Sequence, residues 1–350
     1  MKFFCILSVL TLVGTCAQPR YTTKIQNIKD SIEITDSTLI VRFSETITKE
    51  ELKTHLYAFS SDSLEGRGVG EKGQKLAAEF LKNYYQNENI KSPFGGGNYF
   101  QTIPSSFFSK NIKDSENVLA YIKGSEKPDE ILIISAHLDH LGVSKDGKIF
   151  NGADDDGSGT VALMEMAQAF HLAQKAGFSP KRSILFLHLT GEEIGQKGSE
   201  FYIKYPVFDL ANTLANLNID MIGRIDDLHK NNKDYIYLIG SDRLSKELHY
   251  ISDKINSTFL NINIDYRYNA ENDRNNYYER SDHYSFANQG IPVIFYFNGE
   301  HDDYHKVSDT PDKIDYPMLE RRTKLIFATA WQLANQKHRV KLDSENELLK

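Results

Sequence analysis

Five short segments of the chain carry imidazole and carboxylate groups of the kind that bind zinc. In chain order they are His137-Leu-Asp139-His140, the aspartate-rich segment 152–159, Glu192-Glu193, Asp220 and Tyr304-His305. Imidazole and carboxylate ligands suit a borderline divalent cation, and a further acidic group beside them suits a general base. The residues therefore indicate a hydrolytic site that holds two zinc ions.

At several of these positions a nearby residue of the same type could be the ligand instead. His137 has a carboxylate two residues on that could hold its second ring nitrogen, but His140 is an alternative ligand. One of three consecutive aspartates, Asp154 to Asp156, could bridge two cations about 3.5–4 Å apart. An acidic helix start would explain one or two of these aspartates, but not three between glycines. In the last segment, His301 is the rival of His305.

The apolar pattern alternates between strand-like and helix-like segments. We expect strands at 117–123, 131–136, 183–189, 214–219, 235–239 and 292–297. We expect helices near 48–56, 73–85, 157–175, 194–205, 241–256, 281–289 and 317–336. This alternation predicts an α/β fold with a largely parallel sheet and helices on both faces. In such folds ligands gather at the carboxyl ends of the strands, which is where the five segments fall.

Composition and length set further bounds. With 350 residues and 40% hydrophobic residues the chain can bury one large core, and its net charge of −7 argues against nucleic acid as a partner. We divide the chain into a leader (1–17), a linker or arm (18–45), a domain that carries the expected zinc ligands (46–338) and a polar tail (339–350). No feature of the sequence indicates an oligomeric state. The segment 266–280 is expected to be a long loop, either specificity-determining or merely solvated.

The first 17 residues resemble an export signal. Lys2 precedes a short apolar run and then small residues, and this run is too short to span a bilayer comfortably. Cleavage after Ala17 would release the domain, whereas lipidation of Cys16 would tether it to a membrane; Thr15 is atypical for a lipoprotein box. Because Cys5 and Cys16 are the only cysteines, the mature domain can form no internal disulfide. We expect a periplasmic, secreted or lipid-anchored protein.

The order of the five segments resembles the secreted zinc aminopeptidase family. This family includes aminopeptidase Y and bacterial leucyl aminopeptidases and is related to glutamate carboxypeptidase and glutaminyl cyclase. The resemblance covers residues 48–336 and implies a single-domain, three-layer zinc-exopeptidase fold with a mixed, mostly parallel sheet. It also implies two Zn²⁺ ions, with His137 and Asp220 at one, Glu193 and His305 at the other, and Asp155 bridging.

The same resemblance implies further roles. Glu192 would be the general base, Asp139 the partner of His137, and the Tyr304 hydroxyl would assist the oxyanion. A cis peptide would follow the bridging residue, at Asp155-Asp156, and Ser281-Asp282-His283 would support the wall of the site.

The implied activity is hydrolysis of the N-terminal peptide bond of peptides by a metal-activated water. One alternative is a glutaminyl-peptide cyclotransferase with a single zinc. A carboxypeptidase would need a cation such as Arg224, Arg274 or Arg280 for a free C-terminus. A non-catalytic, receptor-like domain would have lost ligands, whereas this chain keeps all five.

Overall fold

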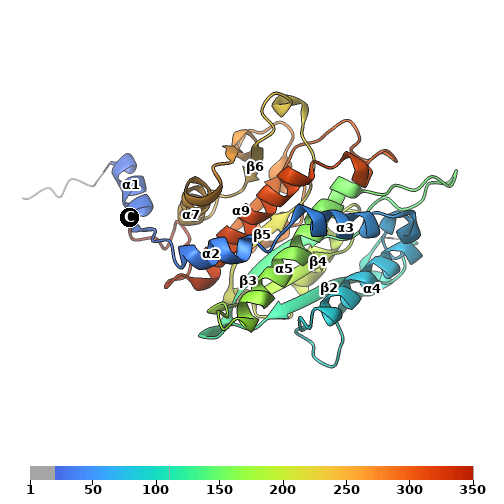
Figure 1. The fold of residues 1–350 in the computed structure, drawn as a ribbon, viewed down its shortest axis with the longest axis horizontal. Coiled ribbons are helices and arrows are strands. Elements are labelled where there is room, and N and C mark those ends of the chain that lie inside the picture. The colour runs from blue at the N-terminus through green and yellow to red at the C-terminus, as the bar shows by residue number, and fades with distance from the viewer. Residues whose placement is uncertain (1–19, 110, 350) are drawn as a thin grey trace, which may run out of the picture.

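The computed structural model describes residues 20–109 and 111–349, in which eight strands form one mixed sheet (Figure 1). The strands are β1 (Phe100–Ile103), β2 (Ser115–Ile122), β3 (Lys127–His137), β4 (Arg182–Leu189), β5 (Thr213–Ile219), β6 (Tyr235–Ile239), β7 (Asn263–Asp265) and β8 (Val293–Phe297). Their order in the sheet is β1-β2-β4-β3-β5-β8-β6-β7. The four central neighbours β4, β3, β5 and β8 run parallel, so their carboxyl ends meet at one edge.

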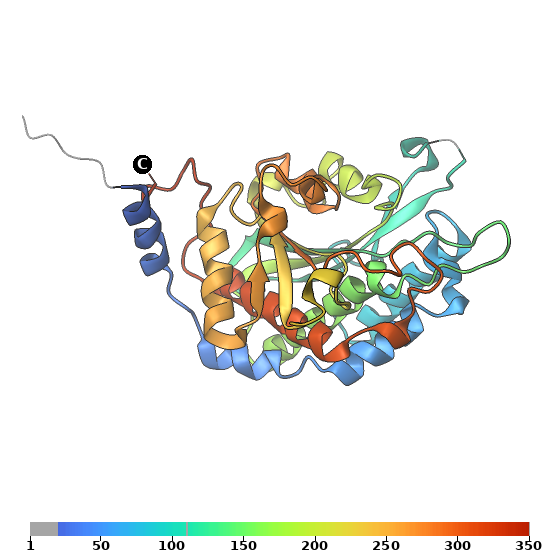
Figure 2. The same ribbon diagram turned by 90° about the horizontal axis from the view of Figure 1, so that it is seen from above.

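Helices cover both faces of this sheet (Figures 1 and 2). They are α1 (Tyr21–Ser31), α2 (Ser37–Ser44), α3 (Lys49–Phe59), α4 (Lys72–Asn87), α5 (Gly159–Lys175), α6 (Lys197–Lys204), α7 (Lys246–Ile255), α8 (His283–Ala287) and α9 (Tyr316–Asn335). The long helices α5 and α9 pack on one face, and α6 and α8 lie on the other. The predicted three-layer α/β architecture is confirmed. The two short strands β1 and β7 were not predicted.

The core follows from the alternation of side chains along the strands. Leu132 and Ile134 of β3 point into the larger apolar cluster beneath α5 and α9, whereas Ile131 and Ile133 point to the opposite cluster. In the larger cluster, Trp331 of α9 stacks on Phe170 of α5 with ring centroids 5.6 Å apart. Burial on both faces fixes the register of the central strands, and with it the positions of the residues at their ends.

The segment 18–45, expected to be a linker or arm, is largely helical in its described part. It contains helices α1 and α2, whose Ile28, Ile40 and Phe43 are buried in the main core. Helix α1 packs on α7, and α2 packs on α9 and α5. Both helices are short, so their apolar positions form only a brief pattern, but Ile28, Ile40 and Phe43 all belong to the main apolar core.

The polar tail is also docked along most of its length. Val340 is buried, the Ser245 hydroxyl donates to the carbonyl of Lys341, and Lys246 pairs with Asp343 at 3.0 Å. The expected export leader lies outside the described residues. Within the described residues, no helix is both long enough and apolar enough to cross a membrane.

Candidate active site

The predicted ligands leave the central strands at the edge where the four carboxyl ends meet. His137 is the last residue of β3, Asp220 directly follows β5, and Glu193 lies shortly after β4. His305 is carried by the loop after β8, and Asp155 by a tight turn before α5. Segments that are up to 168 positions apart in the sequence (305 − 137) therefore converge on one site.

His137, Asp155 and Asp220 form the first cluster. The His137 Nε2 atom lies 3.1 Å from Asp155 Oδ1 and 3.5 Å from Asp220 Oδ1. One ligand atom from each of the three residues lies within 4.8 Å of the others, which is close enough for a single ion to contact all three.

Asp155 and Glu193 face two imidazoles in the second cluster. His305 Nε2 lies 3.0 Å from Asp155 Oδ2 and 3.1 Å from Glu193 Oε2. His140 Nδ1 lies 2.6 Å from Glu193 Oε1 and 3.7 Å from Asp155 Oδ2. The sequence presented His140 as a rival of His137, but the structure brings both imidazoles into the site, at different clusters. Asp155 belongs to both clusters.

The two neighbours of Asp155 have other partners. The Asp154 carboxylate accepts the backbone N–H of Gly223 at 2.7 Å and pairs with His301 at 3.1 Å. The Asp156 carboxylate accepts the backbone N–H groups of His137, Gly159 and Met221. His301, the rival of His305, thus belongs to the support of the site. The peptide between Asp155 and Asp156 is cis, as the family resemblance implied.

Asp139 contacts His137 differently from the expectation. The imidazole Nδ1 lies 3.1 Å from the main-chain oxygen of Asp139, whereas the carboxylate is 3.9 Å away. That carboxylate accepts the backbone N–H groups of Glu192 and Glu193 at 3.3 and 3.4 Å. Asp139 therefore orients His137 through its backbone and holds the Glu192-Glu193 turn through its side chain.

The pKa shifts of the site residues show that the carboxylates stabilise positive charge on the neighbouring imidazoles. Burial acts to raise the pKa of Asp155, but the adjacent His140, His137 and His305 hold it well below its ordinary value. Burial acts to lower the pKa of His305, but Asp155 and Glu193 outweigh it and raise that pKa to about 10. Cations are favoured at the centre of the site, where the acidic oxygens converge.

Glu192 and Tyr304 lie beside these clusters. Burial raises the pKa of Glu192 well above its ordinary value; His137 opposes this shift, and Asp220 and other nearby carboxylates add to it. Burial, followed by the charges of Asp155 and Asp220, raises the pKa of Tyr304, so its hydroxyl stays protonated. The Tyr304 ring stacks on His305 with centroids 3.9 Å apart, and its hydroxyl lies 3.4 Å from the Arg280 guanidinium.

Sequence reasoning gave no role to Arg67 and did not foresee how Ser281 and Asp282 act. The Ser281 hydroxyl donates to Asp220 at 2.6 Å, and the buried Asp282 carboxylate has no hydrogen-bond partner among the described residues. Burial raises the pKa of Asp282 to about 7. Arg67 is fully buried and donates to four main-chain carbonyls around the site. The glycines on both sides of Arg67 were the available signal.

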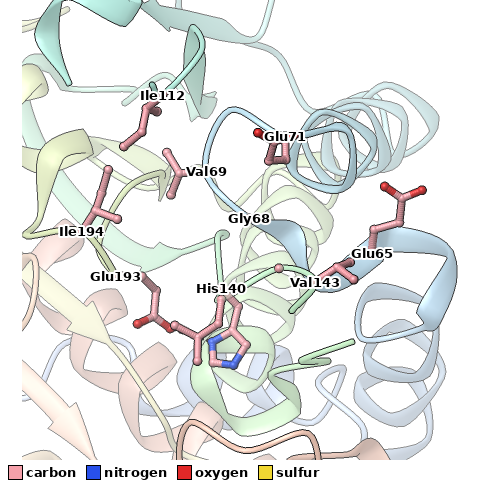
Figure 3. A pocket seen from close by; sticks show the side chains of 11 residues that line it. Glu65, Gly68, Val69, Glu71, Ile112, His140, Val143, Glu193 and Ile194 are labelled. Atoms are coloured by element: carbon pink, nitrogen blue, oxygen red, sulfur yellow. Dashed lines mark ion pairs between the residues drawn. The ribbon is translucent and has the colours of Figure 1, made fainter. Parts of the chain in front are cut away.

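A cavity of about 450 Å³ opens beside the second cluster (Figure 3). His140 and Glu193 line one end, and the apolar side chains of Val69, Ile112, Val143 and Ile194 line its walls. Val143 and Ile194 are exposed at the rim. A volume of this size is within the range that accommodates small ligands or a single large side chain.

The donor set and its burial fit zinc. Three buried atoms that face the cluster centres, His137 Nε2, Asp155 Oδ2 and Glu193 Oε1, have no hydrogen-bond partner among the described residues. Buried polar atoms are rarely left without partners, and imidazole with carboxylate is a usual zinc ligand set. The fold and the site are therefore those expected of a zinc-dependent hydrolase.

Comparison with known families identifies the family. Residues 117–330, more than half of the chain, match Peptidase family M28, and the chain belongs to this family. The chain is 28% identical over 312 residues to a probable zinc metalloprotease of Pyricularia oryzae, covering 77% of this chain and 59% of that protein. It is 26% identical over 240 residues to a probable aminopeptidase of Saccharomyces cerevisiae, covering 67% of this chain and 61% of that protein. The chain thus spans less than two thirds of these relatives.

A solved structure shows the same fold. The zinc aminopeptidase BSAP from Bacillus subtilis superposes with a TM-score of 0.65 at 15% sequence identity, covering 87% of this chain and 99% of that one. The family resemblance stated from the five segments is confirmed, and this family implies zinc.

Proposed function

We propose that this chain is a two-zinc aminopeptidase that removes N-terminal residues from peptides. One observation carries the proposal: two imidazole–carboxylate clusters share the single carboxylate of Asp155. His137, Asp155 and Asp220 would hold one zinc, and Asp155, Glu193 and His305 the other. Bound zinc supplies a Lewis acid that polarises a carbonyl and lowers the pKa of water towards about 7.

Glu192 is suited to move the proton. Its raised pKa makes its carboxylate a stronger base than an ordinary glutamate, which suits it to take a proton from the attacking water and to deliver it to the leaving amine. The backbone of the Glu192-Glu193 turn is fixed by Asp139, so the two glutamates keep separate roles. Glu193 faces His140 and His305, whereas Glu192 interacts electrostatically with His137 and Asp220.

Tyr304 is suited to stabilise the tetrahedral oxyanion. Its hydroxyl remains protonated and can donate a hydrogen bond, and its ring is fixed by stacking on His305. The acidic groups around the first cluster favour the positively charged amine of a free N-terminus. An apolar side chain of the peptide would occupy the cavity of Figure 3.

A pair of matched variants tests the division of roles. Glu192→Gln should keep its zinc content while kcat falls about 10²–10⁴-fold, the usual cost of losing a general acid–base group. Glu193→Gln should lose zinc from one position. Zinc is counted by mass spectrometry, and turnover is followed with aminoacyl p-nitroanilides. Equal zinc loss in both variants would contradict the assignment.

Substrate panels separate the alternatives. An aminopeptidase releases p-nitroaniline from free aminoacyl substrates but not from their N-acetylated forms. A glutaminyl cyclase would cyclise an N-terminal glutamine instead, and a carboxypeptidase would accept a blocked N-terminus. Cyclisation with a single bound zinc would overturn the proposal.

We further propose that the protein is exported. The export-like leader and the confinement of both cysteines to residues 5 and 16 support this proposal. Intact-mass analysis from the native host distinguishes a chain beginning at Gln18 from one lipidated at Cys16. An uncleaved cytoplasmic chain would refute export.

A further inference from the structure

His140 lies at the second cluster, although it is not among the five ligands expected from the sequence. Its side chain is almost fully buried, and its Nδ1 lies 2.6 Å from Glu193 Oε1 and 3.7 Å from Asp155 Oδ2. The two side chains lie at the same end of the cavity in Figure 3. His305 approaches the same carboxylates, and its ring centroid is 5.9 Å from that of His140. Asp155 and Glu193 are thus each approached by two imidazoles.

His140 also belongs to a group of residues that a single ion could contact: one ligand atom from each of His140, Asp155 and Glu193 lies within 4.8 Å of the others. His140 Nδ1, Glu193 Oε1 and Asp155 Oδ2 are all buried, and none has a hydrogen-bond partner among the described residues. Three converging, unpartnered ligand atoms are the arrangement expected around a cation.

The backbone around His140 fixes the ring in this position. The His140 N–H donates to the carbonyl of Arg67 at 3.2 Å, and Arg67 in turn donates to the carbonyl of Leu138 at 2.9 Å. The ring lies against Gly152, where an added Cβ would approach its Cγ and Cδ2 atoms to 2.5 Å. Gly152 also has a φ of +53°, which disfavours other residues. The space beside the second cluster is therefore shaped to the His140 ring.

We propose that His140 is a direct ligand of the second zinc and binds it through Nδ1. This inference rests on the proposed two-zinc function. The second zinc would then have four protein ligands: His140, Asp155, Glu193 and His305. The first would have three: His137, Asp155 and Asp220.

The two zinc sites would consequently differ in whether they can also bind water or substrate. Zinc sites closed by four protein ligands are typically structural, whereas sites with three keep a position open for water or substrate. The first position, next to the general base candidate Glu192, would be the one that admits the reacting groups. The second would hold its zinc more tightly and organise Asp155 for both.

The test uses the full chain loaded with ¹¹³Cd²⁺ and labelled with ¹⁵N-histidine. Because a nitrogen bound to ¹¹³Cd shows a direct spin coupling, the ring atoms that bind metal can be counted. His137 and His305 present Nε2 to the carboxylates, whereas His140 presents Nδ1. We expect two coupled Nε2 signals and one coupled Nδ1 signal in the wild-type protein.

Variants assign the Nδ1 signal. His140→Gln should remove it and weaken one of the two zinc positions more than about 100-fold in competition titrations, beyond the 10–100-fold usual for residues outside the ligand set. His171→Gln, a change on α5 away from the site, should leave both the signals and the affinities unchanged.

Failure of this inference is distinct from failure of the proposed function. Two bound ions with only two coupled Nε2 signals would show that His140 is not a ligand, while leaving the two-zinc proposal intact. One bound ion with a coupled Nδ1 signal would support His140 and overturn the two-zinc proposal. The wild-type spectrum decides the question even if His140→Gln does not fold.

Discussion

Replacing Arg67 tests whether a buried guanidinium assembles the two loops that carry His140 and Asp155. Its Nε donates to Leu138 at 2.9 Å, one terminal nitrogen donates to Phe59 and Asn151 at 3.2 and 2.6 Å, and the other donates to Gly152 at 2.8 Å. All four acceptors are main-chain carbonyls. Arg67→Ala would leave them without this donor at once.

The magnitude follows from these contacts. Hydrogen bonds to a charged group contribute about 1.5–3 kcal/mol each, so four give a gross value of about 6–12 kcal/mol. Burial opposes this: it lowers the pKa of Arg67 from 12.5 to about 10, which corresponds to about 3 kcal/mol, and water can enter the space left by the side chain. We expect the free energy of unfolding to fall by about 3–5 kcal/mol, the range for losing one partner of a buried charged contact.

Urea unfolding followed by circular dichroism measures this loss, and a chelator competition measures zinc affinity in the same samples. Arg67→Lys is the matched control: it keeps the charge but cannot reach four carbonyls, so it should show a smaller loss of stability together with weakened zinc binding. If Arg67→Ala loses less than about 1 kcal/mol and binds zinc normally, Arg67 does not organise the site. If Arg67→Ala does not fold, zinc binding by Arg67→Lys still decides the matter.

Three further predictions concern the metal and its surroundings. Removing the metal with 1,10-phenanthroline should abolish peptidase activity and lower the thermal unfolding midpoint. Adding zinc at about 100 times its Kd should raise the free energy of unfolding by about 2.7 kcal/mol per site. An unchanged midpoint would contradict stabilisation by the metal. Ser281→Ala removes the hydrogen bond to Asp220 and should weaken zinc at the first cluster about 10-fold in a competition titration, whereas unchanged affinity would show that this contact is dispensable. The folded-state pKa of Asp282 is raised from 3.8 to about 7, so in metal-free protein its contribution to stability is lost as the pH rises from about 4 to 7. The free energy of unfolding of Asp282→Asn, measured relative to wild type in urea titrations, should therefore rise by about 3 kcal/mol between pH 5 and pH 8, and a pH-independent difference would refute this.

The sequence predicted the edge of the sheet at which the site lies because each ligand follows an apolar strand or opens a helix. His137 and Asp220 come at the ends of β3 and β5, and Asp155 lies just before α5. These local patterns are strong, since strands buried on both faces form long apolar runs. The six main strands and the long helices were accordingly found, whereas the edge strands β1 and β7, with only three or four residues each, gave too short a pattern.

The rest of the site depends on contacts that no local pattern encodes. His140 and His137 looked like alternatives because they are neighbours in the sequence, yet the chain turns between them and each faces a different cluster. Asp139 offers both a carbonyl and a carboxylate, and only the structure shows which of the two reaches His137. Arg67 lies 70 positions before His137 (137 − 67), so its hydrogen bonds to the site could not be inferred from spacing.

The convergence of the ligands from four parallel strands has a consequence for how the protein acquires its metal. In a zinc finger, ligands a few residues apart let the ion drive folding of a short peptide. Here His137 and His305 meet only after β5 and β8 have joined β3, so no early fragment of the nascent chain can offer a complete set of donors. We therefore expect metal binding to follow sheet assembly. In hydrogen-exchange experiments, the amides of β3 and β5 should already be protected in the metal-free protein, and zinc should add protection mainly to the loops that carry Asp155, Glu193 and His305.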